Sequence, residues 1–278
     1  MEAVDPTAPA KIRLAGISKE FVAPRTGQRT IAISDVSLDI RQGEFLCIVG
    51  PSGCGKSTVL NMIAGLTLPS RGEVSMDGRS ITAPGPERGV VFQDYALFPW
   101  KTVAENIEFG PRFRTSAPLP AAERQKLVNH YIELVSLKGA ENKYPHELSG
   151  GMRQRCAFAR ALANEPEVLL MDEPFAALDA QTRLILQEEL LRIWGENLPS
   201  RQRKTIVFIT HGIDEAVFLA DRVAVMSNHP GQIKTIMDVD LPRPRHEGLR
   251  ATAAFQDLAG EIWRLIRQEA YEATIDHN

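Results

Sequence analysis

Residues 50 to 57 read Gly-Pro-Ser-Gly-Cys-Gly-Lys-Ser, which matches the phosphate-binding template G-x-x-x-x-G-K-[ST] at every position. Its glycines let backbone N–H groups fold around the oxygens of a nucleotide triphosphate, because no Cβ stands in the way. Lys56 then reaches the β- and γ-phosphate oxygens, and the Ser57 hydroxyl is placed to ligate Mg²⁺. The segment predicts binding of ATP or GTP. Its predicted nucleotide contacts are Gly50, Pro51, Ser52, Gly53, Cys54, Gly55, Lys56, Ser57 and Thr58.

Two carboxylates follow an apolar run further along the chain. Residues 168 to 171 are apolar, and Asp172 and Glu173 come directly after them. If this run is a strand beside the phosphate loop, Asp172 can hold Mg²⁺ through water. Glu173 can then polarise the water that attacks the γ-phosphorus. The alternative is that the two acids only cap the next turn; the phosphate loop in the same chain favours the catalytic interpretation.

A phosphate loop needs a strand before it and a helix after it. Residues 45 to 49 form an apolar run of strand length, and residues 57 to 64 carry apolar side chains at helical spacing. Gly65 is placed to end that helix. These flanks count against the alternative, which is a tight turn between strand and helix that binds no ligand.

The remaining chain alternates between strand-like and helical segments. We expect strands at 12–21, 30–40, 73–76, 89–92, 167–171, 205–209, 222–226 and 232–237. We expect helices at 123–135 and 152–163, and a docked helix in the terminal segment, where Phe255, Leu258, Ile262, Leu265 and Ile266 form an apolar stripe. Strands separated by helical segments predict an α/β fold with a mostly parallel sheet, preceded by an N-terminal antiparallel β region with a turn at 24–27.

The composition is that of an ordinary globular protein. The chain has 278 residues, 44% hydrophobic and 24% charged, which allows one large or two modest domains. The net charge of −3 provides no positive field for nucleic acid, so we expect no nucleic-acid partner. We see no secretion signal, and no run approaches the roughly 18 apolar residues of a membrane span. Three cysteines without metal-site spacing predict free thiols in a reducing cytosol.

A third motif points to a family. Residues 148 to 155 read Leu-Ser-Gly-Gly-Met-Arg-Gln-Arg, which resembles the signature motif of ABC-type ATPases. These residues precede a helix expected to start near Met152, so they expose N–H groups and the positive end of a helix dipole. The alternative is a plain glycine-rich helix cap. The resemblance, which covers roughly residues 10 to 240, implies that two copies pack head to tail around two ATP molecules. Ser149, Gly150 and Gly151 of each copy would then face the phosphate loop of the other.

Four further positions match the family pattern one at a time. Gln93 corresponds to the glutamine that ligates Mg²⁺ and senses the γ-phosphate, and His211 to the switch histidine that contacts the γ-phosphate. Asp179, in Ala-Leu-Asp, matches the loop that crosses the dimer seam. Phe21 corresponds to the aromatic residue that stacks on adenine; the alternative is a core or hairpin phenylalanine. The catalytic set is therefore Glu173, His211 and Gln93, and the metal set is Ser57, Gln93 and Asp172.

Two positions depart from the family pattern. Ala176 stands where many relatives have Ser or Gly, which removes one hydrogen bond at the seam. Gly212 follows the switch histidine where Asp is common, and glycine there weakens the helix cap by only a few tenths of a kcal/mol. Neither departure removes a group that the chemistry requires.

The resemblance implies the ATP-hydrolysing subunit of an ABC importer, bound peripherally at the cytoplasmic face of the inner membrane. Its partners would be a second copy, integral membrane permeases and, indirectly, a substrate-binding protein. Residues 97 to 100, Leu-Phe-Pro-Trp, belong to the region that grips a permease helix in the family. Residues 97–100, 210–216 and 240–245 are similar to the nitrate, sulfonate and taurine branch, which implies a small anionic solute.

Two other functions fit the sequence less well. A soluble ABC ATPase of DNA repair or translation would carry long coiled-coil arms or two nucleotide units, and neither is present. A regulatory module without turnover would not need Glu173 and His211. We expect an ABC ATPase domain at 10–240, with its nucleotide-binding core at 10–94 and 165–240 and a helical signature subdomain at about 95–164. A C-terminal extension with a docked helix follows at 241–278.

Overall fold

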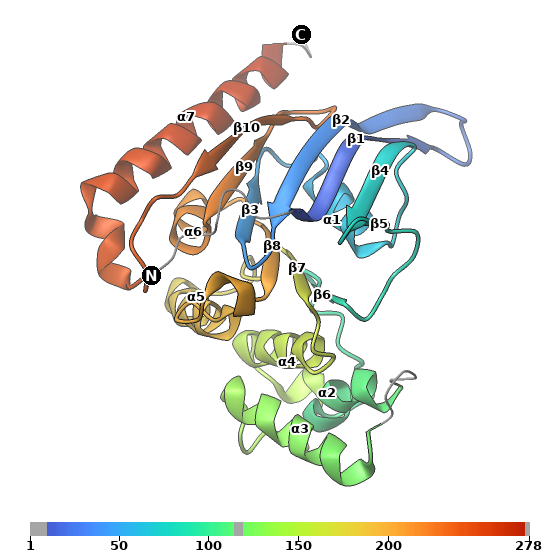
Figure 1. The fold of residues 1–278 in the computed structure, drawn as a ribbon, viewed down its shortest axis with the longest axis vertical. Helices are drawn as coiled ribbons and strands as arrows, with labels where there is room; N and C mark the ends of the chain where they lie inside the picture. Colours follow the sequence, from blue (N-terminus) through green and yellow to red (C-terminus); the bar gives the residue numbers. More distant parts are fainter. Residues whose placement is uncertain (1–9, 114–118, 276–278) are drawn as a thin grey trace. The chain divides into compact units, whose positions relative to one another are not determined.

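The computed structural model describes residues 10–113 and 119–275, without the side chains of residues 200 and 270–275. The chain forms two compact units, coloured by residue number in Figure 1. The first unit comprises Met1–Gly85 and Leu190–Asn278, and the second comprises Pro86–Glu189. The first unit therefore joins the beginning and the end of the chain around one core.

The first unit contains an antiparallel sheet in the order β2-β1-β4-β5. Its strands are β1 (Ala10–Val22), β2 (Arg29–Arg41), β4 (Arg71–Met76) and β5 (Arg79–Ser80). In β2 the buried residues Val36, Leu38 and Ile40 alternate with exposed ones, because successive side chains of a strand point to opposite faces. The predicted N-terminal antiparallel region is confirmed.

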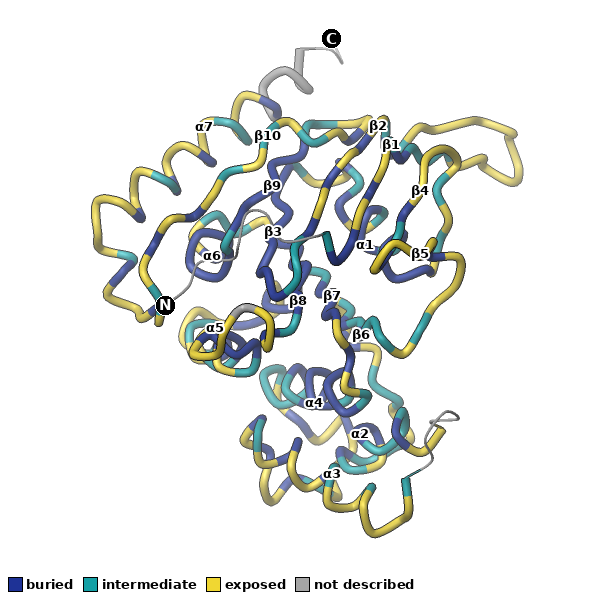
Figure 2. The backbone as a smooth tube through the Cα atoms, viewed as in Figure 1, coloured by how far each residue is buried: buried dark blue, intermediate teal, exposed yellow. Residues whose placement is uncertain are grey.

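A second set of strands in this unit is mainly parallel. Strand β3 (Phe45–Val49) pairs in parallel with β8 (Thr205–Ile209) and β9 (Arg222–Met226), and β10 (Ile233–Asp238) pairs antiparallel with β9. Every residue of β3, β8 and β9 is buried, as Figure 2 shows in dark blue. Continuous apolar strands of this kind are typical of a parallel sheet covered on both faces. The predicted α/β class is confirmed.

Helices α1 (Lys56–Ala64), α6 (Ile213–Leu219) and α7 (Ala253–Ile275) belong to the first unit, with short 3-10 turns η2 (Ser200–Gln202) and η3 (Glu247–Ala251).

Helix α1 ends as predicted at Gly65, which has a left-handed φ of 76°. A Cβ there would lie 2.3 Å from the carbonyl oxygen of Ala83, so only glycine fits. Helix α7 packs on α6 and β9 with Phe255 and Ile262 buried (Figure 1).

The second unit is mostly helical. Its strands β6 (Arg88–Val91) and β7 (Val168–Asp172) are parallel to each other, and its helices are α2 (Val103–Arg112), α3 (Ala121–Leu134) and α4 (Gly150–Leu162), with a 3-10 turn η1 (Pro145–Glu147). Helix α5 (Ala180–Trp194) begins in this unit and ends in the first. Two predicted boundaries need correction: α4 starts at Gly150 rather than near Met152, and β7 includes Asp172.

The arginine side chains of the Pro-Arg-rich segment at 242–245 are buried, although Pro242 and Pro244 are exposed. The Arg243 guanidinium pairs with Asp221 at 2.8 Å and with Glu196 at 3.1 Å. Arg245, only 5% exposed, donates to the carbonyl oxygens of Val217 at 2.6 Å and Phe218 at 3.0 Å. Burial lowers the pKa of Arg245 to about 9. This segment therefore satisfies carbonyl groups at the C-terminal end of α6.

We expect Arg245→Ala to lower the free energy of unfolding by about 2–4 kcal/mol, because two buried helix carbonyls lose their charged donor. Urea titration followed by circular dichroism measures this change. Arg264→Ala removes an exposed arginine from α7 and serves as the control. Equal stability of the two variants would contradict the capping role of Arg245.

Candidate functional site

The phosphate loop leaves β3 at Val49 and enters α1 at Lys56. Gly53 and Gly55 have left-handed φ angles of 80° and 95°, which side chains with a Cβ rarely adopt. Gly55 is also the N-cap of α1 and provides no side-chain hydrogen bond to the first turn. Backbone N–H groups at this helix start are consequently oriented for an anion, with the positive end of the helix dipole behind them.

Lys56 already lies across this loop. Its ammonium donates to the carbonyl oxygens of Gly50 at 2.9 Å and Pro51 at 2.8 Å, and the residue is 6% exposed. The positive charge is therefore placed at the loop. Ser57, the next residue, is exposed, so its hydroxyl is accessible to a ligand. These features fit a nucleotide triphosphate.

His211 follows strand β8 in the same unit and is exposed. The helix after it, α6, has Gly212 at its N-cap without a side-chain bond. Two residues that sequence reasoning missed stabilise this turn: the Thr210 hydroxyl accepts from the Gly212 N–H at 2.9 Å and donates to the buried carboxylate of Glu215. The neighbouring threonine thus satisfies the backbone N–H of the N-cap residue itself, while the first-turn N–H groups of α6 receive no side-chain cap.

Phe21 lies in the β1–β2 hairpin and is 46% exposed, which excludes the core alternative. The ammonium of Lys19 lies 5.2 Å from the centre of the Phe21 ring, at cation–π distance. The ring is therefore accessible to a base. Stacking on adenine stays a prediction.

The signature residues occupy a helix start in the second unit. Ser149 is the N-cap of α4, and its hydroxyl accepts from the Met152 N–H at 3.3 Å. A Cβ at Gly151 would come within 2.9 Å of Thr182 Cγ2, at the start of α5. Asp179 caps α5 by accepting from the Thr182 N–H at 2.9 Å, and this bond lowers the pKa of Asp179. The structure thus brings Gly151 and the Asp179 loop together at two adjacent helix starts.

The two carboxylates lie at the end of β7. Asp172 is the last residue of the strand, and both side chains are half-buried. Glu173 has a left-handed φ of 45°, and its carbonyl oxygen accepts from the Ala176 N–H at 3.2 Å. A left-handed glutamate costs about 1 kcal/mol or more, and such strain is common at functional positions. The turn therefore holds Glu173 in an unfavourable backbone conformation.

Gln93 is exposed in the turn after β6, and the chain beyond it is fixed by α4. Tyr95 and Ala96 both have left-handed φ angles, of 63° and 46°. The guanidinium of Arg160, on α4, donates to the carbonyl oxygens of Tyr95 at 3.0 Å and Ala96 at 2.5 Å. Sequence reasoning missed Arg160, because no local pattern relates it to Gln93. The signature helix and the loop after Gln93 are thereby connected directly.

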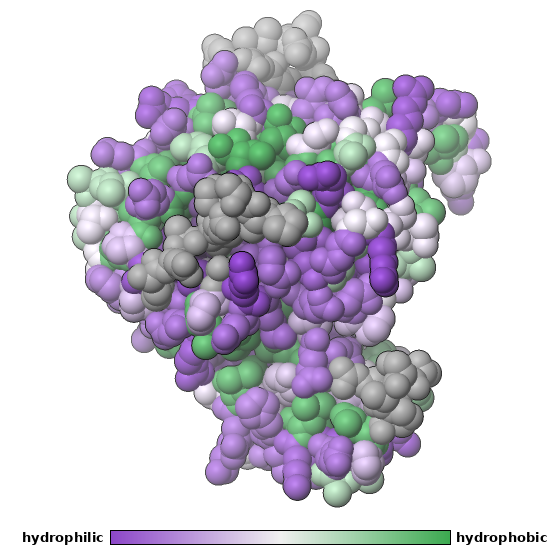
Figure 3. Space-filling view, viewed as in Figure 1, coloured by the Kyte–Doolittle hydropathy of each residue, from purple (hydrophilic) through white to green (hydrophobic). Residues whose placement is uncertain are grey.

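The loop that follows Gln93 presents an exposed aromatic side chain. Asn106 is fully buried and bonds the backbone of this loop: its amide oxygen accepts from the Phe98 N–H at 2.9 Å, and its NH₂ donates to the Lys101 carbonyl at 3.0 Å. Trp100 is 71% exposed on the loop so formed, 5.9 Å from the ring of Phe98. Figure 3 shows hydrophobic side chains over the α2 region of this unit. A rigid turn therefore carries an exposed tryptophan.

The predicted site residues are divided between the two units. The phosphate loop, Phe21 and His211 belong to the first unit; Gln93, Asp172, Glu173, Ser149, Gly150, Gly151 and Asp179 belong to the second. Within residues 10–113 and 119–275, no three His, Cys, Asp or Glu side chains form a metal cluster. The predicted set of one hydroxyl, one amide and one carboxylate suits Mg²⁺, which keeps several waters and binds substrate phosphates.

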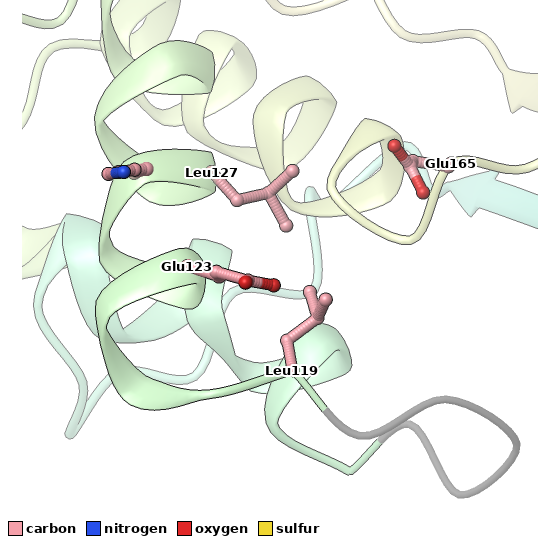
Figure 4. A pocket seen from close by; sticks show the side chains of 5 residues that line it. Leu119, Glu123, Leu127 and Glu165 are labelled. Atoms are coloured by element: carbon pink, nitrogen blue, oxygen red, sulfur yellow. The ribbon is translucent and has the colours of Figure 1, made fainter.

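A pocket of about 370 Å³ lies elsewhere in the second unit (Figure 4). Leu119, Glu123, Lys126, Leu127 and Glu165 line it. In Figure 4, Glu123 and Leu127 project from α3 towards Leu119. Because these residues carry none of the predicted nucleotide chemistry, this pocket is separate from the candidate site.

A family model described as ABC transporter matches residues 33–176, more than half of the chain. An uncharacterized ABC transporter ATP-binding protein, MJ0412 of Methanocaldococcus jannaschii, is 46% identical over 95% of this chain and 94% of its own length. The nitrate import ATP-binding protein NrtD of Synechococcus elongatus is 49% identical over 82% of this chain and 81% of its own length. The bicarbonate transport ATP-binding protein CmpC of the same species is 53% identical over 79% of this chain but 32% of its own length.

Comparison with solved structures also finds ATP-binding cassettes. The chain is similar to the ATP-binding cassette MJ0796, solved as a dimer in a post-hydrolysis state bound to ADP and Pi. The TM-score is 0.72 at 32% identity, and the match covers 83% of this chain and all of the other. Among the helices that the structure describes here, none combines the length and the apolar character of a membrane span.

We expect Lys56→Ala to weaken ATP binding at least about tenfold, because a charged donor to the phosphates is lost. Binding of a fluorescent ATP analogue, titrated with the purified chain, measures this change. Lys138→Ala, on an exposed lysine, is the control. Equal affinity of Lys56→Ala and the unmodified chain would refute the phosphate-loop assignment.

Proposed function

The chain belongs to the ABC transporter family and is an ABC-type ATPase that binds ATP, and we propose that it is the energising subunit of an importer. The observation that carries this proposal is the 49% identity to the nitrate import protein NrtD over most of both chains. The alternative of an ATPase in DNA repair or translation is not favoured, since the named relatives act in transport.

The phosphate loop would bind the triphosphate through its backbone N–H groups and the Lys56 ammonium, and Phe21 would stack on adenine. The left-handed glycines, the helix start without a side-chain cap and the exposed Phe21 ring support this role. Ser57, Gln93 and Asp172 would hold Mg²⁺, which would neutralise charge on the phosphates during transfer.

Glu173 would accept a proton from the attacking water, while His211 and Gln93 would contact the γ-phosphate. The strained backbone of Glu173 and the hydrogen-bonded turn after His211 support preorganised positions for these side chains. Arg160, through the carbonyls of Tyr95 and Ala96, would position the loop that carries Gln93.

A second copy of the chain would complete each nucleotide site. Ser149, Gly150 and Gly151 would offer the start of α4 to the partner's ATP, and Asp179 would lie at the seam. Their adjacency within one unit supports a common role, and the similar cassette MJ0796 is described as a dimer. ATP binding would close the two copies, and hydrolysis would allow them to separate.

Integral membrane permeases would be the partners that convert this closure into transport. The exposed Trp100, on a loop fixed by Asn106, supports a permease contact in the second unit. The chain would then lie peripherally at the cytoplasmic face of the inner membrane. Residues 10–240 would form the ATPase domain, with the signature subdomain at about 95–164 and an extension at 241–278.

The solute would be a small anion. Relatives at about 50% identity are named for import of nitrate and transport of bicarbonate, which share a planar, anionic form. Sulfonates such as taurine remain in the proposed class through the subfamily likeness. Because the solute would meet the binding protein and permeases, this chain would contribute energy rather than recognition.

We expect Glu173→Gln to bind ATP normally but to lower the hydrolysis rate by about 10²–10⁴-fold, because the general base is lost. Phosphate release measures turnover, and size-exclusion chromatography with ATP detects the dimer expected to accumulate. Glu188→Gln, on an exposed glutamate of α5, is the matched control. Normal turnover in Glu173→Gln would exclude Glu173 as the base.

We expect Trp100→Ala to keep ATPase activity within about twofold while weakening the complex with co-expressed permeases, because a large contact side chain is removed. Co-purification from membranes measures the complex, and uptake of labelled nitrate and bicarbonate measures transport. Trp263→Ala, on the exposed face of α7, is the control. An intact complex in Trp100→Ala would contradict the contact, and co-purifying nucleic acid would contradict the importer.

A further inference from the structure

The phosphate loop is packed from outside by two segments that are distant in sequence. A Cβ added to Gly231, between β9 and β10, would lie 1.9 Å from the carbonyl oxygen of Cys54. A Cβ added to Gly55 would lie 2.4 Å from Ile33 Cδ1. The backbone of Gly231 thus lies directly against the Cys54 carbonyl, and the Ile33 side chain lies against Gly55, so neither glycine has room for a side chain.

The turn that carries Gly231 is itself hydrogen-bonded to β2. The Gly231 N–H donates to the Ala32 carbonyl at 3.0 Å, and the Ser34 N–H donates to the Gly231 carbonyl at 3.0 Å. The Ser227 hydroxyl accepts from the Gln232 N–H at 3.0 Å, which closes the turn. Gly231 is therefore bonded on both of its backbone sides at the position where it touches the phosphate loop.

The Glu269 carboxylate, on α7, interacts with residues on both sides of Gly231 in this turn. Glu269 is 5% exposed; its Oε2 accepts from the Asn228 N–H at 3.1 Å, and its Oε1 forms an ion pair with the Lys234 ammonium. Asn228 precedes Gly231 and Lys234 follows it. A buried carboxylate with both oxygens bonded in this way fixes local geometry more than a surface ion pair does.

The packing of α7 determines where Glu269 lies. Phe255, Ala259 and Ile262 are buried along the same face of the helix, which contacts α6 and β9. Figure 1 shows α7 running alongside the strands that bear the turn. The C-terminal helix is thus connected to the phosphate loop through Glu269, the β9–β10 turn and the Gly231–Cys54 contact.

We propose that Glu269 is a positioning residue for ATP binding: through Glu269 and the β9–β10 turn, α7 holds the phosphate loop in its binding conformation. This inference rests on the proposed role of the phosphate loop. A loop that is already ordered loses less conformational entropy when it binds the triphosphate. Loss of the Glu269 interactions is therefore expected to weaken nucleotide affinity. Of the proposed hydrolytic residues, Glu173 and Gln93 belong to the other unit, and His211 follows β8 rather than the Cys54–Gly55 corner, so turnover at saturating ATP is affected less.

The test uses the full chain with Glu269→Ala, and with Glu261→Ala on the exposed side of the same helix as control. Glu269→Ala is expected to raise KM for ATP and the Kd of a fluorescent ATP analogue about three- to tenfold, with kcat within about twofold. Glu269→Gln keeps an acceptor for Asn228 and should give an intermediate shift. A lower Tm with unchanged KM and Kd would show a merely structural role and overturn the inference.

A second variant tests the contact without altering α7. Gly231→Ala places a methyl group on the Cys54 carbonyl, so we expect at least tenfold weaker binding of the analogue. Gly260→Ala, whose Cβ would meet nothing within 4 Å, is the control. Unchanged affinity in Gly231→Ala would overturn the inference that the Gly231–Cys54 contact positions the phosphate loop. If instead the unmodified chain fails to bind the analogue, or Lys56→Ala binds it equally well, the phosphate-loop assignment itself fails.

Discussion

A phosphate loop binds its ligand through backbone N–H groups, and a backbone in this conformation cannot stabilise itself by regular hydrogen bonding. The left-handed glycines at 53 and 55 create the concave loop, but glycine also loses more conformational freedom on ordering than any other residue. Its shape therefore depends on its surroundings: the buried strand β3 before it, α1 after it, and the contacts from Ile33 and Gly231. The Lys56 ammonium adds a hydrogen bond within the loop, to the carbonyl oxygen of Gly50.

Buried charges connect distant segments of the first unit. Glu44, before β3, pairs with Arg222 at 2.5 Å, and Arg243 pairs with Asp221 and Glu196. Such pairs are expensive to desolvate, so they stabilise only where every polar atom finds a partner. Here they join segments that are far apart in sequence, which makes the C-terminal residues part of the nucleotide-binding unit rather than an appendage.

In the second unit the candidate anion-binding groups are the N–H groups at helix starts, whereas in the first unit they belong to the phosphate loop. Ser149 and Asp179 each cap a helix, and the two starts lie side by side at Gly151 and Thr182. Arg160, on the same helix as the signature, fixes the left-handed residues after Gln93. A displacement of α4 would consequently reach the signature and the loop after Gln93 together. In the proposed function, this would be a physical route that couples contact with the nucleotide to contact with the second copy.

The sequence alone determined the features that follow local rules. Apolar runs predicted the buried strands, period-two alternation predicted β2, and Gly65 predicted the end of α1. The phosphate loop was recognisable because its glycine spacing reflects backbone conformation, and the signature because it resembles the family motif. Only the tertiary structure revealed the Thr210–Glu215 hydrogen bond, the burial of Arg245, the Arg160 bonds and the position of Glu269 beside the turn at Gly231. Several of these interactions join residues that are dozens of positions apart, and a hydrogen bond formed by folding leaves no periodic pattern along the chain.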